Sequence, residues 1–143
     1  MSIEINGSGT LTGVLSIPES VTITAAAPAS TTNFDYVTQS IQYYTSNATT
    51  NFTLNIRGNS STTLNSLLLV GQSITLVLMV TNGGTPYRPT TIQIDGSTVT
   101  PEWQGGTAPA AGNANSIDVY SFTVIKTAGT PTFLVLGAQT QFA

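Results

Sequence analysis

The sequence contains no cysteine and no histidine among its 143 residues. The absence of cysteine excludes disulfides, thiolate metal sites and cysteine nucleophiles. The absence of histidine excludes the Ser-His-Asp triad, imidazole metal ligands and the commonest general base. We therefore expect a non-enzymatic protein that has no cofactor and no metal centre.

Charged residues are also scarce, at 6% of the chain, where an ordinary globular domain carries about 25%. The only cations are Arg57, Arg88 and Lys126, and the net charge is −3. Since neutralising phosphates requires clusters of basic residues, we expect no nucleic-acid partner. A surface this poor in charge lacks the usual protection against self-association, so we expect partners to cover part of it.

The six carboxylates offer few sites for chemistry. A glycosidase needs two of them facing each other across a cleft, about 5 to 10 Å apart, and Glu102 with Asp118 is the only candidate pair. Asp95 has a simpler role in a turn, although Asp95 with Ser97 and backbone carbonyls is an alternative as a calcium site. An enzyme is accordingly the third of the function classes that we consider.

Long hydrophobic runs are missing as well. The most apolar stretch, residues 64–80, is interrupted by polar residues and Gly71, and a membrane helix needs about 20 mainly apolar residues. Residues 2–6 contain an acid and no base, unlike the start of a secretory signal. We expect neither a membrane span nor export by the standard route.

Threonine, serine and asparagine make up about a third of the chain. These side chains compete with helical hydrogen bonds, whereas threonine alternating with branched and aromatic residues suits strands. Phe52, Leu54 and Ile56 alternate with polar residues, which indicates a half-buried strand. Residues 76–80 are apolar at every position, which predicts a central strand covered on both faces.

Turn signals separate these runs. Asp95-Gly96 predicts a tight hairpin, with residues 97–103 as its return strand. Residues 62–69 are consistent with one or two helical turns, capped by Thr62 or Thr63 and ended by Gly71. About eight strands at regular spacing predict an all-β protein, an antiparallel β-sandwich or a jelly roll.

Two segments are candidates for binding. Residues 1–30 form either an extended arm or edge strands followed by a linker, and residues 31–143 form the sandwich domain. In the N-terminal segment the apolar residues that we expect to dock on a partner are Ile3, Ile5, Leu11, Leu15 and Ile17. The second segment is the loop at residues 104–116, with Tyr87, Trp103 and Gln104 as candidate binding residues. Trp103 either closes the core, stacks on a sugar or anchors a protein interface.

Several strings resemble a module of tailed phages of marine bacteria, especially cyanobacterial phages. They are residues 43–59, 64–73, 94–96, 103–109 and 117–127, and the resemblance extends from Phe34 to Ala143. In that family the module often ends longer virion or tail-fibre proteins, and it brings no catalytic residues.

The resemblance implies a bacteriophage virion structural protein, made in the host cytoplasm and carried on the extracellular particle. Because only a short segment precedes the module here, we expect capsid decoration, with the N-terminal segment docking on the major capsid protein. The alternative is a tail-fibre or fibre-tip module that recognises host surface glycans. By analogy with jelly-roll virion components we expect a homo-oligomer, a trimer.

Overall fold

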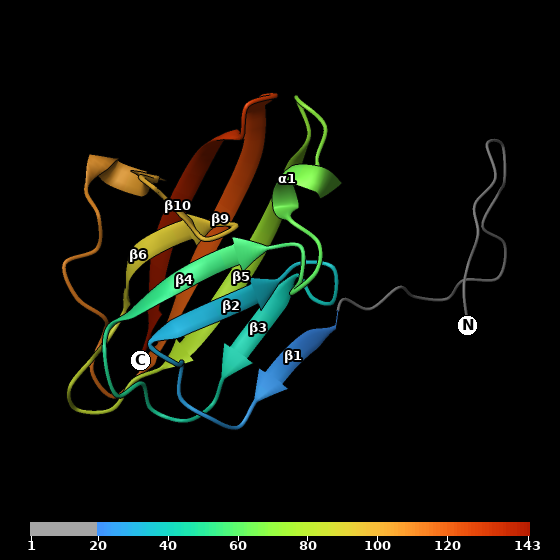
Figure 1. The fold of residues 1–143 in the computed structure, drawn as a ribbon. Helices are drawn as coiled ribbons and strands as arrows, with labels where there is room; N and C mark the ends of the chain where they lie inside the picture. Colours follow the sequence, from blue (N-terminus) through green and yellow to red (C-terminus); the bar gives the residue numbers. More distant parts are fainter. Residues whose placement is uncertain (1–19) are drawn as a thin grey trace, which may run out of the picture.

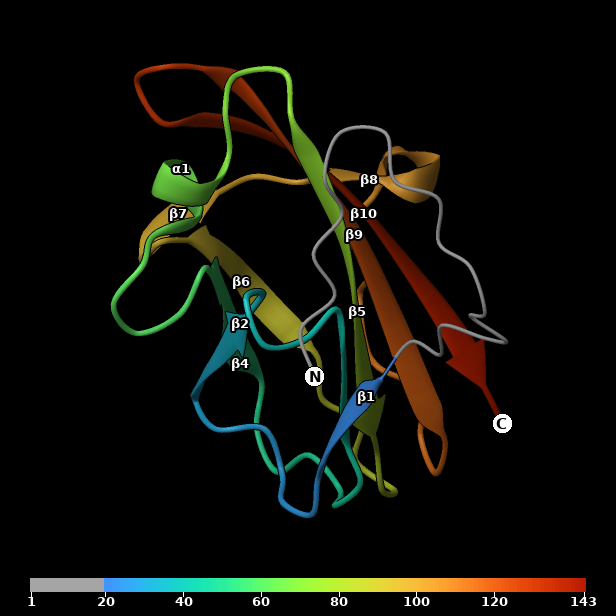
Figure 2. The same ribbon diagram turned by 90° about the vertical axis from the view of Figure 1, so that its right-hand side faces the viewer.

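Alternating apolar and hydroxyl side chains form strands throughout residues 20–143, which are the residues that the structure, a computed structural model, describes. The elements are β1 (Val21–Thr24), β2 (Thr31–Asp35), β3 (Ile41–Tyr44), β4 (Phe52–Arg57), α1 (Leu64–Leu67), β5 (Ser73–Thr81), β6 (Pro89–Ile94), β7 (Ser97–Val99), β8 (Glu102–Trp103), the 3₁₀ turn η1 (Gln104–Gly106), β9 (Ile117–Ala128) and β10 (Thr132–Phe142). The strands form two sheets, of six and four strands, that stack face to face (Figures 1 and 2). The expected all-β sandwich is confirmed.

The first half of the fold is a coil in which successive strands alternate between the two sheets. β1, β3 and β5 are neighbours in one sheet and run parallel, while β2, β4 and β6 are parallel neighbours in the other. Parallel neighbours cannot be joined by a tight hairpin and need a crossover connection. Here each crossover includes a strand of the opposite sheet, so the coil builds both layers together (Figure 1).

The second half of the fold is antiparallel, apart from the short strand β8, which pairs parallel with β10. β9 pairs with β5 on one side and with β10 on the other, so that the six-stranded sheet has the order β1-β3-β5-β9-β10-β8. The four-stranded sheet, in the order β2-β4-β6-β7, ends in the hairpin of β6 and β7. Asp95 and Gly96 both have positive φ in this hairpin, as the Asp-Gly signal predicts.

The core lies between the sheets because each strand buries alternate side chains. On β9 the residues Tyr120, Phe122 and Val124 are fully buried, and their neighbours in sequence point to the opposite face. The same alternation on β2, β4, β5 and β10, together with Leu64 of α1, buries the other large apolar side chains. The largest of these are Phe34, Phe52, Leu54, Ile56, Leu64, Leu76, Leu78, Val80 and Val135.

A single helical turn, α1, closes one end of the sandwich. The Thr63 hydroxyl accepts a hydrogen bond from the Ser66 backbone N–H, which confirms the expected cap. The Asp95 carboxylate accepts from the backbone N–H groups of Leu64 and Asn65, at 2.7 and 2.9 Å. Asp95 therefore ties the hairpin to the start of α1, and this position explains why an acid occupies the turn.

The structure differs from the sequence prediction in three respects. The sheets are mixed, with parallel pairs in the coil, and the described residues contain ten strands where about eight were expected. The return strand predicted over residues 97–103 is divided at Pro101, because proline cannot donate to a sheet ladder. β7 therefore stays in the four-stranded sheet, while β8 pairs with β10 in the other.

The third difference concerns β5. Its inward residues Leu76, Leu78 and Val80 are fully buried, but Val77 and Met79 on the outer face are only half-buried. Among the described residues, no element lies over that face as a further layer. The coverage expected on both sides of this strand is thus present on one side only.

β1 occupies the edge of the six-stranded sheet, where it pairs with β3 from Val21 to Thr24. Of the segment predicted as an arm or edge strands, residues 21–24 therefore form an edge strand. The docking candidates Ile3, Ile5, Leu11, Leu15 and Ile17 lie outside the described residues.

Candidate functional site

The outward faces of the two sheets differ sharply in chemistry. On the four-stranded sheet, Arg57 of β4 pairs with Asp35 of β2, with 2.6 Å between Nε and Oδ1. Next to this pair, the Asn55 amide donates to the Asn33 side-chain oxygen at 2.8 Å. The other outward residues of these strands are threonine and glutamine. This face is polar and suited to contact with water.

The outer face of the six-stranded sheet is mainly apolar, with serine and threonine hydroxyl groups between the apolar side chains. The registers between strands align Ile23, Tyr43, Met79 and Val119 in one row across β1, β3, β5 and β9. We call the outward apolar side chains of this sheet the apolar face. They are Val21, Ile23, Ile41, Tyr43, Val77, Met79, Ile117, Val119, Ile125, Leu134, Leu136 and Phe142.

Much of the apolar face is open to solvent. Ile23 is 69% exposed and Leu136 is 43% exposed. Asp118 and Lys126, the two charged residues of β9, point into the molecule and are buried. Within the described strands, the only charge on this side of the sheet is Glu102 of β8, beside Leu136 at the far edge.

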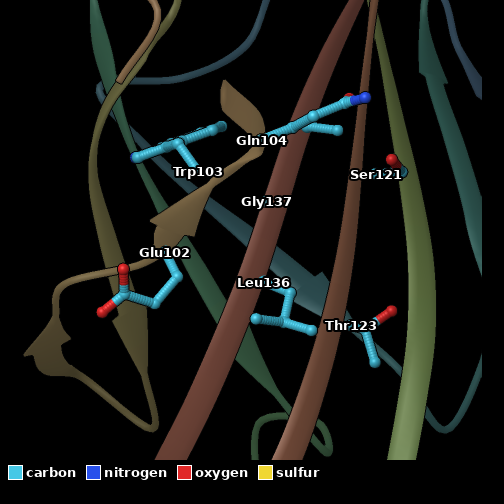
Figure 3. A pocket seen from close by; sticks show the side chains of 8 residues that line it. Glu102, Trp103, Gln104, Ser121, Thr123, Leu136 and Gly137 are labelled. Atoms are coloured by element: carbon cyan, nitrogen blue, oxygen red, sulfur yellow. The ribbon is translucent and has the colours of Figure 1, made fainter. Parts of the chain in front are cut away.

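A shallow hollow of about 350 Å³ lies at that edge, over β8, β10 and β9 (Figure 3). Polar groups from Glu102, Gln104, Ser121 and Thr123 line it together with Leu136. The hollow therefore combines hydroxyl, amide and carboxylate groups with the apolar side chains of Trp103, Leu136 and Ala138.

Trp103 lines this hollow but packs mainly toward the core. Its ring meets Phe122 edge-on, with 5.7 Å between centroids and an angle of 68° between the planes. Gly137 lies between them in the sheet, and a Cβ there would be 3.0 Å from two carbons of the indole. Glycine thus leaves space for the indole to cross the strand, and Trp103 closes this edge of the core.

The other two loop candidates lie apart from each other. Gln104 is exposed and lines the hollow beside Trp103. Tyr87 does not line the hollow; it packs partly buried against the core, and its backbone N–H donates to the Asn82 side chain at 2.9 Å. The structure thus brings two of the three predicted loop residues together.

A buried polar cluster surrounds Asp118 at the opposite end of β9 from Lys126. Its Oδ2 accepts hydrogen bonds from the Asn82 amide and the Asn113 backbone N–H, both at 2.9 Å. Burial raises the pKa of the Asp118 carboxyl above its ordinary value, while the hydrogen bonds from Asn113 and Asn82 oppose the shift. Burial, together with the Asp118 charge, also raises the pKa of the Tyr120 hydroxyl. The cluster holds the long loop before β9 in place.

The carboxylate pair considered for glycosidase chemistry does not flank a cleft. Glu102 projects outward in register with Leu136, whereas Asp118 is fully buried on the inner side of the same sheet. Both carboxylate oxygens of Asp95 accept hydrogen bonds from backbone N–H groups of α1. Residues 20–143 contain no group of three acidic side chains that could hold a metal ion.

Sequence reasoning predicted a second covered face for residues 76–80, but it did not predict that this face is open in the single chain. Residues 76–80 and 117–125 carry apolar side chains on both faces of their strands, and this pattern indicated a second covered face. The pattern could not tell whether this chain or another molecule supplies the cover.

In the described part of the chain, no helix is long and apolar enough to cross a membrane. Comparisons of this chain with known protein families, with curated proteins and with solved structures found no match.

Proposed function

We propose that this chain is a non-enzymatic structural protein of a bacteriophage particle that decorates the capsid. The observation that carries the proposal is the apolar face. This face presents a row of apolar side chains to the outside and has one carboxylate at its edge; the row is Ile23, Tyr43, Met79 and Val119. Such a face is suited to a protein that works within an assembly. The phage-like strings described above favour a virion as that assembly.

The docking segment in this proposal is the N-terminal one, with Ile3, Ile5, Leu11, Leu15 and Ile17 as its contact residues. This segment enters the sandwich at β1, the edge strand that carries Val21 and Ile23 of the apolar face. We propose the major capsid protein as the partner, with this chain present as a homo-oligomer, a trimer, that binds neither nucleic acid nor membrane.

Antibody labelling of intact particles tests the location by electron microscopy. Label at regular positions over the head is the expected result. Label confined to the tail or to fibre tips contradicts capsid decoration and favours the alternative below. An absence of label on every particle contradicts a virion role altogether.

Substitutions in the N-terminal segment test the docking role. Replacing Leu15 and Ile17 by aspartate should abolish co-sedimentation of the chain with particles that lack it. A matched control replaces the neighbouring Thr12 and Ser16 by aspartate, which adds the same charge without removing an apolar side chain. Equal binding of both variants contradicts docking through the apolar residues.

A second candidate function is a fibre-tip module that recognises host surface glycans. The hollow beside Trp103 favours it, because Glu102, Gln104, Ser121 and Thr123 offer groups that hydrogen-bond to sugar hydroxyls. A glycan array should then detect binding that Gln104→Ala weakens and that Thr98→Ala, on the opposite sheet, leaves unchanged. Absence of binding to every surface glycan contradicts this candidate.

A further inference from the structure

In the part of the chain that the structure describes, nothing covers the apolar face, although its sequence pattern predicts a cover. Val77 and Met79 of β5, and Val119 of β9, lie in the interior of a six-stranded sheet and yet remain half-buried. Their inward neighbours are completely buried by the four-stranded sheet. Two apolar faces on one strand are typical of sheets covered on both sides, so a second layer is missing from the described residues.

The size of this face is sufficient for a protein interface. Five strands, β1, β3, β5, β9 and β10, contribute to it, and they average about eight residues each. With a strand spacing of about 4.8 Å and a rise of about 3.4 Å per residue, the projected area is roughly 600 Å². Stable protein pairs bury about 600 to 1,000 Å² on each partner, so one sheet face meets the lower bound.

The chemistry of the face favours another copy of the same chain. When identical patches pack about a two-fold axis, residues near the axis meet their own equivalents, so charges there repel one another. The outward residues of the five strands are apolar or carry hydroxyl groups, and none of them is charged. Two copies of this face can therefore pack together without repulsion between like charges.

A lipid surface fits less well. Membrane-binding faces typically combine apolar side chains with lysine or arginine at their rim. Lys126 is buried on the inner side of β9, Arg57 lies on the opposite sheet, and Arg88 belongs to the loop before β6. None of these cations borders the apolar face in the sheet register.

We propose that the apolar face of one copy packs against the apolar face of another, completing a second sandwich between two six-stranded sheets. The inference goes beyond the proposed function, because it concerns contacts between copies and holds whether or not the assembly is a phage particle. In a trimer the face of each copy would be divided between two neighbours, whereas a two-fold pair would use it whole.

The mass of the protein in solution, measured by sedimentation equilibrium over a range of concentrations, tests this proposal. The native chain should give a multiple of its 14.8 kDa. Met79→Lys should weaken self-association about tenfold or more, because it places like charges against each other in the interface. Thr91→Lys on β6, also half-buried but on the polar face, is the matched control and should assemble like the native chain.

Ile23→Lys is a second variant, which distinguishes a loss of self-association from a loss of the fold. Ile23 is 69% exposed on an edge strand, so a lysine there leaves the core intact and should still weaken self-association. Circular dichroism confirms the fold of each variant. A native chain that stays at 14.8 kDa at every concentration overturns the proposal, as does native-like assembly of both face variants.

Cross-linking identifies the contacting surfaces. Because the chain has no cysteine, one thiol can be placed at a time, at Ile41, Val77 or Val119 on the apolar face or at Thr91 on the polar face. At least one position on the apolar face should give a cross-linked pair with a short bis-maleimide, and Thr91→Cys should not. Cross-linking through Thr91→Cys alone overturns the proposal.

Discussion

Replacing Lys126 by an apolar side chain of similar size should lower the stability of the folded protein. Lys126 lies on the inner side of β9 and is 8% exposed. Its Nζ donates to the backbone carbonyls of Asn65 and Leu68, at 2.7 and 2.8 Å. Together with Asp95 at the other end, it fixes α1 to the sheets.

Replacing Lys126 by methionine keeps most of the apolar stem but removes both hydrogen bonds. Hydrogen bonds from a charged donor each contribute about 1.5 to 3 kcal/mol. Because water can reach the partly buried Asn65 carbonyl, we expect a net loss of about 3 kcal/mol in the free energy of unfolding. For a domain of this size, the loss corresponds to a fall of about 10 °C in Tm.

Urea unfolding followed by circular dichroism and by the fluorescence of Trp103 measures this loss. The matched control is Arg57→Met, since Arg57 is a paired cation that is partly exposed, on the outer face of β4. Exposed ion pairs contribute at most about 1 kcal/mol, so the control should lose no more than that. If Lys126→Met lowers the free energy of unfolding no more than Arg57→Met does, the hydrogen bonds of the Lys126 ammonium do not stabilise the fold as expected.

Three further predictions concern other buried contacts. The raised pKa of Asp118 means that the folded state binds a proton more tightly than the unfolded state. The free energy of unfolding of the native chain, relative to that of Asp118→Asn, should therefore rise as the pH falls from 7 toward the ordinary carboxyl pKa near 4. Urea titrations at several pH values measure this difference, and a difference that does not change with pH contradicts the prediction. Gly137→Ala should cost about 1 to 2 kcal/mol and shift Trp103 emission to longer wavelength, because its Cβ displaces the indole; unchanged emission contradicts this. Asp95→Ala should cost about 2 to 3 kcal/mol in thermal melts, because two N–H groups of α1 lose their acceptor; a loss below about 0.5 kcal/mol is the contrary result.

The features that sequence reasoning predicted are those set by local chemistry. The hairpin follows from Asp95-Gly96, where two neighbouring residues must adopt positive φ. The α1 cap at Thr63 depends on a side chain and a backbone N–H three residues apart. The strand at residues 52–57 follows from alternation alone. In each case the deciding interaction lies within a few residues of the signal.

The features that were missed depend on contacts distant in sequence. The parallel pairing of β1 with β3, and of β2 with β4, is a property of the whole coil, and no local motif marks it. The sequence left three roles open for Trp103, because the partners that show it closing the core, Phe122 and Gly137, come 19 and 34 positions later. The contact of Asp118 with the Asn82 amide likewise joins residues 36 positions apart, and no local motif marks it.

We propose that this chain works within an assembly that covers its apolar face. The most direct test compares the rates at which a thiol reagent labels Val77→Cys and Thr91→Cys in the assembled protein. Both positions are half-buried in the single chain, and the same variants in a Met79→Lys background supply the rates for the dissociated state. We expect assembly to slow labelling at Val77→Cys and to leave the rate at Thr91→Cys unchanged. Equal rates at Val77→Cys in the assembled and dissociated states would contradict it.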